Sequence, residues 1–217
     1  MPLCRLAVLP LFGLAATPLA AQDVPAVLAR ADSAYRKLTS LRAEFEQTIV
    51  NPMLGGPEVS RGTLYLVPPS KLAMRFRDPE GDRIVADGQW LWAYTPSTVP
   101  GQVIRQPVPH AGAASPNLFA QFVDRPLERY QATAAGSDSV AGDPVDLVRL
   151  VPKVEGLPFR RVTIAVSRET GLLRWLDIVE ESGQRRSLVL VSMAPNAPVL
   201  PAEVRFDVPR GVRVVGQ

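Results

Sequence analysis

The chain has 217 residues, a length that suits one sizeable domain, and its 24 Lys and Arg against 21 Asp and Glu give a formal charge of +3. This slight basic excess, without a long run of one sign, argues against a nucleic-acid-binding protein. The 22 prolines argue against long helices and favour many short strands that end in loops.

The first 21 residues have the composition of a secretory signal peptide. Arg5 supplies the positive charge, residues 6–19 are apolar apart from Thr17, and two alanines precede the expected cleavage region. A transmembrane anchor is the alternative, but the apolar run is shorter than the roughly 20 residues that a span requires. We therefore expect residues 1–21 to be removed on export and residues 22–217 to form one domain.

Export also decides how the single cysteine is interpreted. Cys4 lies before the apolar run, so it is not the acylated cysteine of a lipoprotein precursor and leaves with the signal peptide. The mature chain then has no disulfide, cysteine metal site or cysteine nucleophile, and its stability has to come from packing.

The mature chain is expected to begin with a helix and continue into strands. Apolar residues recur at three- and four-residue spacings over residues 24–38, which predicts an amphipathic helix. From Leu41 the spacing changes to two, which predicts a strand. Residues 61–96 contain four short runs separated by turns and predict an antiparallel meander. In its second run Leu72, Met74 and Phe76 share one face, because side chains alternate along a strand.

Turn residues place the connections of this meander. Asp87-Gly88 separates two of its runs and is predicted to form a two-residue hairpin turn, since both residues tolerate positive φ. After a short strand at residues 102–105 and a Pro-, Gly- and Ala-rich loop, Ser115 is a candidate cap for a helix over residues 116–123. That helix carries Leu118, Phe119 and Phe122 on one face. It could be a movable lid or a connection plugged permanently into the core.

The second half repeats the strand pattern. The candidate strands are residues 127–134, 143–151, 159–167, 172–180, 185–193, 203–207 and 211–215. About eleven strands and two helices predict a mainly β protein with a few helices (α+β), built on one large and strongly curved sheet. Short helices cannot fill the concave side of such a sheet alone, so large side chains either fill it or line a cavity for an apolar ligand.

The sequence contains no recognisable motif for catalysis or for cofactor binding. His110 is the sole histidine, and its neighbours offer neither a carboxylate for a catalytic triad nor other zinc ligands. Phosphate-binding and nucleophile-elbow motifs are absent as well. We therefore expect a protein that is not an enzyme and needs no cofactor.

Several segments together resemble the outer-membrane lipoprotein carrier family, LolA. They are LTSLRAEFEQ at residues 38–47, GTLYLVPPSKLAMRF at 62–76, IVADGQWLWAY at 84–94 and FDVPRGVRV at 206–214. The resemblance implies an unclosed β half-barrel whose concave apolar face is covered by helices. It further implies a monomeric periplasmic carrier of triacylated lipoproteins. Such a carrier takes its cargo from an inner-membrane ABC transporter and delivers it to an outer-membrane acceptor resembling LolB, or directly to the membrane.

The resemblance also assigns expected site residues. The lipid-binding wall would be Leu41, Phe45, Leu66, Leu72, Met74, Phe76 and Ile84, and the lid would be Leu118, Phe119 and Phe122. Family members often carry a lid-holding arginine where this chain has Pro68, so that role is not transferred. A lipid-sensing regulatory module of the same fold and an esterase are the alternatives; the first usually has a second domain and the second needs a nucleophile that the sequence does not offer.

Overall fold

The computed structural model describes residues 23–53, 55–108 and 119–216, which form one twelve-stranded sheet with three helices on its concave side and a 3-10 helix on its outer side. The helices are α1 (Val24–Lys37), α2 (Ala120–Val123), α3 (Pro126–Arg129) and the 3-10 helix η1 (Pro201–Val204). The strands are β1 (Leu41–Val50), β2 (Glu58–Val67), β3 (Lys71–Asp78), β4 (Arg83–Asp87), β5 (Trp90–Tyr94), β6 (Gln102–Pro107), β7 (Tyr130–Val140), β8 (Asp143–Pro152), β9 (Phe159–Ser167), β10 (Leu173–Glu180), β11 (Arg185–Pro195) and β12 (Arg213–Val215).

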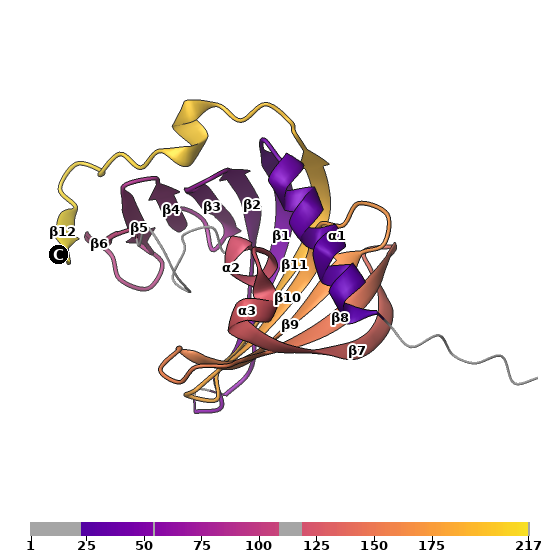
Figure 1. Ribbon diagram of the computed structural model, residues 1–217. Coiled ribbons are helices and arrows are strands. Elements are labelled where there is room, and N and C mark those ends of the chain that lie inside the picture. The colour runs from indigo at the N-terminus through magenta and orange to yellow at the C-terminus, as the bar shows by residue number, and fades with distance from the viewer. Residues whose placement is uncertain (1–22, 54, 109–118, 217) are drawn as a thin grey trace, which may run out of the picture.

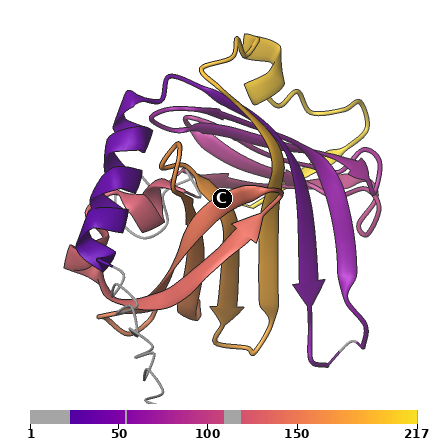
Figure 2. The same cartoon turned by 90° about the vertical axis from the view of Figure 1, so that its right-hand side faces the viewer.

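The sheet curves strongly without closing. Its strand order is β12-β6-β5-β4-β3-β2-β1-β11-β10-β9-β8-β7, so β1 and β11 join the two halves of the chain at the centre. Figures 1 and 2 show the sheet bending around α1, α2 and α3. The prediction of a mainly β, strongly curved and unclosed sheet is confirmed.

Helix α1 starts and packs as its sequence indicates. The side chain of Asp23 caps it by accepting a hydrogen bond from the backbone N–H of Ala26 at 3.2 Å. Its buried residues, Val27, Leu28 and Ala31, form a stripe that packs on the concave side of the sheet. Within the described ranges, the helices are too short or too polar to cross a membrane.

The outer face of strands β2–β6 carries a second, separate core. Its buried side chains include Tyr65, Val85 and Trp92 from the sheet, Val204 from η1 and Phe206 from the segment that follows η1. Phe206 stacks on Trp92 with ring centres 5.2 Å apart. We call residues 199–212 the C-terminal strap; it runs over the outside of these strands (Figure 2), on the side opposite to α1.

Two predicted strands are wrong in part. Residues 203–207 form the end of η1 and an extended segment instead of a strand, because Pro201 starts a helical turn and the Glu203 carboxylate accepts from the backbone N–H of Leu200 at 2.8 Å. The strand expected from residue 127 begins at Tyr130, since Pro126 opens the short helix α3.

Two further details differ from expectation. The described residues form twelve strands, in agreement with the prediction of about eleven, but the outermost strand, β12, pairs with β6 in parallel and not antiparallel. Asp87 does not occupy the hairpin turn but ends β4 opposite Lys71. Its carboxylate accepts hydrogen bonds from the backbone N–H groups of Gln89 and Trp90, which moves the turn one residue along the chain. The predicted signal peptide, His110 and the first three residues of the predicted helix over 116–123 lie outside the described residues. Within the described part of that helix, α2 covers residues 120–123.

Candidate functional site

The seven residues predicted to line a lipid-binding wall lie together on the concave face. Leu41 and Leu66 are fully buried, and Phe45, Leu72 and Met74 are nearly so. Phe76 and Ile84 are half-buried and pack against the same cluster. Apolar side chains from α1, α2 and the remaining strands pack with these residues, and we call the whole set the concave cluster. The concave cluster includes every predicted wall residue.

Strand register explains why these residues meet. Leu41 of β1 lies opposite Leu66 of β2, which lies opposite Leu72 of β3. Met74 lies opposite Ile84 of β4 in the same way. Because directly opposed residues share a face, an apolar pattern of period two in each strand becomes a continuous apolar surface across the sheet.

A glycine lets two aromatic rings of this surface meet. Gly62 of β2 is the register partner of both Phe45 in β1 and Phe76 in β3. With only a glycine between them, the two phenylalanine rings meet edge to face, with their centres 5.2 Å apart and their planes at 86°. The wall is therefore densely packed at this end.

Two of the three predicted lid residues, Phe119 and Phe122, are described by the structure and pack into the concave cluster. Phe119 and Phe122 are 1% and 0% exposed. The Phe119 ring centre is 6.1 Å from that of Tyr35 in α1, and the Phe122 ring packs against Tyr130 and Phe159. The third predicted lid residue, Leu118, lies outside the described residues. The structure thus holds α2 against the apolar face.

The second half of the chain also contributes buried apolar side chains to the concave cluster, and the predicted site residues did not include them. Buried concave residues from this half include Leu150, Ile164, Leu176, Leu188 and Leu190. The same period-two alternation could have identified them, as it could have identified Leu64, two residues before Leu66. Tyr35 and Tyr130 were also missed, because an aromatic at helical spacing or at a strand start carries no signal of its own.

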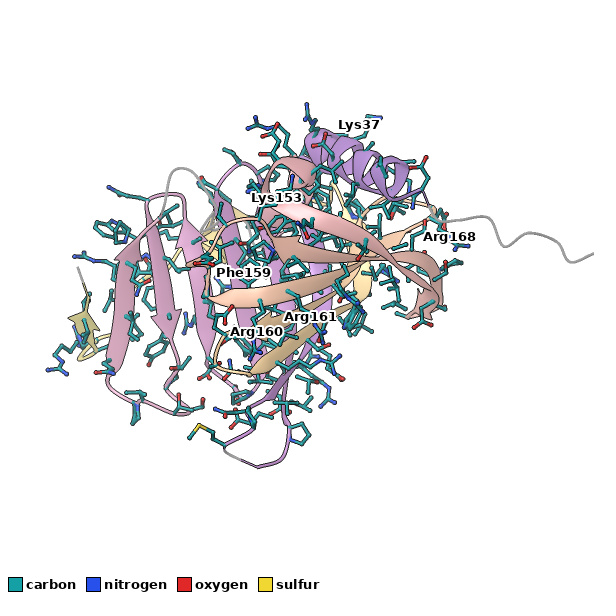
Figure 3. The ribbon with its side chains drawn as sticks, turned by 60° about the horizontal axis from the view of Figure 1, so that its bottom comes forward. Lys37, Lys153, Phe159, Arg160, Arg161 and Arg168 are labelled. Atoms are coloured by element: carbon teal, nitrogen blue, oxygen red, sulfur yellow. The ribbon has the colours of Figure 1, made fainter. Side chains whose placement is uncertain are left out.

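An ionic cluster fixes α1 at the rim of the concave face. The carboxylate of Asp146 in β8 accepts from Arg30 of α1 at 2.6 Å and from Arg168 at 2.9 Å. Figure 3 shows Arg168 near the end of α1 where the chain enters it, with Lys37 at the other end of the helix. Gly171, in the loop after Arg168, packs so closely on α1 that a Cβ there would lie 2.9 Å from the carbonyl oxygen of Arg30. The N-terminal half of α1 is therefore tied to the sheet by charge and by shape.

The titratable groups inside the concave cluster stay neutral. Burial raises the pKa of the Tyr35 hydroxyl and also that of Tyr130. In the part of the chain that the structure describes, His, Cys, Asp and Glu side chains form no group of three that could hold a metal. The arrangement therefore offers apolar contact and neutral hydroxyls, which suits binding of an apolar molecule.

A pocket of about 330 Å³ lies on the outer side of the sheet. Leu147, Trp175 and Val189 line it, together with the end of β7 and Ala141 in the turn that follows. Register places these three side chains on the outer face, and none of the predicted wall residues borders the pocket.

Comparison with solved structures agrees on the fold. An uncharacterised conserved protein from Thermus thermophilus superposes with a TM-score of 0.56 at 13% identity, covering 89% of this chain and 98% of that one. The complex of MucA and MucB from Pseudomonas aeruginosa contains a chain that superposes with a TM-score of 0.51 at 15% identity, covering 89% of this chain and 64% of that one.

Sequence comparison gives the family. An outer-membrane lipoprotein carrier protein of Sodalis glossinidius is 27% identical over 202 residues, covering 93% of this chain and 92% of that protein. The protein of the same name from Cupriavidus necator is 28% identical over 209 residues, covering 94% and 95%. These are transport proteins and not enzymes. The model of the LolA family, described as outer membrane lipoprotein carrier protein, matches residues 36–207. The chain therefore belongs to the LolA family of outer-membrane lipoprotein carrier proteins.

Proposed function

We propose that the protein is a periplasmic carrier that holds the acyl chains of lipoproteins against its concave face and moves them from the inner to the outer membrane. The observation that carries the proposal is the continuous apolar surface on the inside of an unclosed sheet, with α1 and α2 lying on it. The family match over residues 36–207 supports the same cargo.

The energetics of acyl chains explain why such a carrier is needed. Each buried CH₂ group contributes about 0.8 kcal/mol, so three acyl chains amount to tens of kcal/mol and do not cross water unaided. A carrier has to offer the acyl chains an apolar surface of comparable extent and later release the chains. We propose that Leu41, Phe45, Leu66, Leu72, Met74, Phe76 and Ile84 form this wall, and that the segment with Leu118, Phe119 and Phe122 moves aside as a lid.

The proposal includes partners and a location. Residues 1–21 would direct export and be cleaved, leaving a monomeric protein in the periplasm. An inner-membrane ABC transporter would load it, and an outer-membrane acceptor resembling LolB, or the membrane itself, would receive the cargo. Native mass spectrometry of the protein purified from its own periplasm tests this, with bound lipoprotein expected. Protein that is always empty and instead binds tightly to an inner-membrane signalling protein would favour a sensor.

A charge placed on the wall tests the binding face. Ile84 is a better position than Met74, because Ile84 is half-buried whereas a glutamate at the 5%-exposed Met74 would endanger folding. We expect Ile84→Glu to lower lipoprotein release from inner-membrane vesicles by at least about tenfold, since a carboxylate would face the acyl chains. The measurement is the fraction of lipoprotein recovered in the soluble phase.

The matched control is Val59→Glu, which replaces another β-branched residue by the same side chain at a 41%-exposed position of β2 outside the concave cluster. Circular dichroism confirms that both variants are folded. Unchanged release with Ile84→Glu, or equal loss with both variants, would contradict the assignment of the concave face.

A further inference from the structure

Two tyrosines of the concave cluster have buried hydroxyl groups without a partner. Tyr35 lies on α1 and Tyr130 opens β7. Among the residues that the structure describes, neither hydroxyl oxygen has a hydrogen-bond partner, and both oxygens are shielded from solvent. The Tyr35 hydroxyl lies close to the backbone of Leu173 without a hydrogen bond of normal geometry.

Both tyrosines pack against the same short segment. The Tyr35 ring lies against Phe119, and the Tyr130 ring lies against Phe122, 6.1 Å between centres in each case. Phe119 is the N-cap residue of α2, and Phe122 lies within the helix, three positions further along the chain. The two hydroxyls therefore belong to one aromatic cluster beneath α2, which Phe159 completes from β9.

An unpartnered buried hydroxyl is unusual and calls for a reason. Buried polar atoms in proteins are nearly always hydrogen-bonded, because water is lost on burial and nothing replaces it. Phenylalanine supplies the same ring without this penalty, and the neighbours Phe119, Phe122 and Phe159 show that the cluster accepts phenylalanine. The two hydroxyl groups therefore do not improve the packing, since phenylalanine would fill the same space.

The surroundings indicate what kind of partner they would take. Burial keeps both hydroxyls protonated, so they are neutral donors. The guanidinium of Arg129, which lies over the Tyr130 ring at 5.8 Å, donates to the backbone carbonyl of Asp124. A neutral acceptor oxygen attached to hydrocarbon fits neutral donors in an apolar cluster, because no charge has to be buried.

We propose that Tyr35 and Tyr130 donate hydrogen bonds to the ester carbonyl oxygens that join acyl chains to the glyceryl group of a bound lipid. The concave face then recognises acyl esters and not hydrocarbon alone, and the two hydroxyls fix the depth at which the chains begin. This inference rests on the proposed carrier function and adds a specific polar contact to it.

A pair of synthetic ligands tests the contact. One is a peptide with an N-terminal diacylglyceryl cysteine, and the other is its dialkyl ether analogue, which keeps the chains and lacks the carbonyl oxygens. Isothermal titration calorimetry gives the affinity of each for the wild type and for Tyr35→Phe, Tyr130→Phe and the double variant. We expect the loss of each hydroxyl to lower the affinity for the ester peptide by about three- to tenfold and to leave the affinity for the ether peptide unchanged.

Two controls separate this contact from a structural role. Tyr65→Phe changes a tyrosine of the outer face, close to Glu203, and should leave both affinities unchanged. In the absence of ligand, Tyr35→Phe and Tyr130→Phe should have a melting temperature equal to or above that of the wild type. A lower melting temperature would mean that the hydroxyls already have partners in the free protein, and would overturn the inference.

The remaining outcomes are also decisive. Equal loss of affinity for the ester and ether peptides, or no loss for either, would overturn the ester contact while leaving the carrier function intact. Failure of the wild type to bind either peptide would overturn the carrier function itself, and the inference with it.

Discussion

At the scale of single residues, Gly62 shows how a missing side chain shapes the wall. A Cβ at this position would lie 2.1 Å from the carbonyl oxygen of Arg75 in the neighbouring strand. Because that atom belongs to the backbone, the strands would have to move. We expect Gly62→Ala to lower the free energy of unfolding by about 1–3 kcal/mol, measured by urea unfolding followed through tryptophan fluorescence. Gly56→Ala, where nothing lies within 4 Å, is the control, and equal stability of both variants would contradict the argument.

Asp87 gives stability a dependence on pH. Burial alone would raise the pKa of its carboxyl group, but the hydrogen bonds from the Trp90 N–H, the Trp92 indole and the Gln89 N–H outweigh it and lower the pKa below its ordinary 3.8. A lowered pKa means that the fold stabilises the carboxylate, so the contribution is present above the ordinary pKa and is lost as the pH falls through the folded value.

The corresponding test compares Asp87→Asn with the wild type over a pH series. We expect the variant to be less stable near neutral pH, because one acceptor oxygen becomes an NH2 group that cannot accept a hydrogen bond, and the charge that strengthens the remaining bonds is lost. The difference in the urea midpoint should shrink as the pH falls below the ordinary pKa of 3.8, because protonation removes the charge that the fold stabilises. A difference that is constant across the series would show that charge plays no part.

At the scale of elements, an ionic cluster around Asp146 holds α1 on the sheet. Asp146 joins Arg30 and Arg168, and its side chain is only 11% exposed. Asp146→Ala should lower the free energy of unfolding by about 1–3 kcal/mol, because two charge-assisted hydrogen bonds are lost and the arginines are left at a half-buried site. Asp32→Ala removes only the solvent-exposed pair with Arg36 on the same helix and should change little.

Hydrogen exchange of the α1 amides locates the effect. Asp146→Ala should speed exchange in the N-terminal half of α1, next to Arg30, before the sheet is affected. Uniform acceleration over the whole sheet would mean that the pair stabilises the fold globally and not the seating of the helix.

The sequence predicted the elements whose bounds are set by residues close to them in the chain. The strand at residues 159–167 has the predicted bounds, and α1 and β10 differ from theirs by one residue, because period and flanking turns are both written in neighbouring residues. The C-terminal strap was not predicted, because the alternation around Phe206 is set by a partner, Trp92, that lies more than a hundred positions away. The wall residues could be named in advance because they alternate, whereas Tyr35 and Tyr130 matter only through what surrounds them.

At the scale of the whole molecule, the sheet has a core on each face, and the two have different tasks. The outer core under the C-terminal strap includes Phe206, which is 6% exposed, and among the described residues it shares no buried side chain with the concave cluster. Stability and ligand binding are therefore separable by mutation.

Phe206→Ala provides the test. We expect it to lower the free energy of unfolding by about 3 kcal/mol through the cavity that it leaves, while the folded protein binds a diacylated peptide with unchanged affinity. Val208→Ala, at a 40%-exposed position of the same segment, is the control. Unaltered stability, or an affinity that falls together with stability, would show that the two faces are coupled.

An unclosed barrel has two edge strands, and in this sheet they are β7 and β12. A free edge exposes unpaired backbone groups and invites association with another chain, so it has to be made unattractive. Strand β12 is only three residues long, and β7 is interrupted by a bulge between Ala134 and Gly136 that twists it out of line. The opening that would admit an acyl chain thus creates a risk of edge-to-edge aggregation, and substitutions that lengthen β12 or straighten β7 would raise that risk without touching the binding wall.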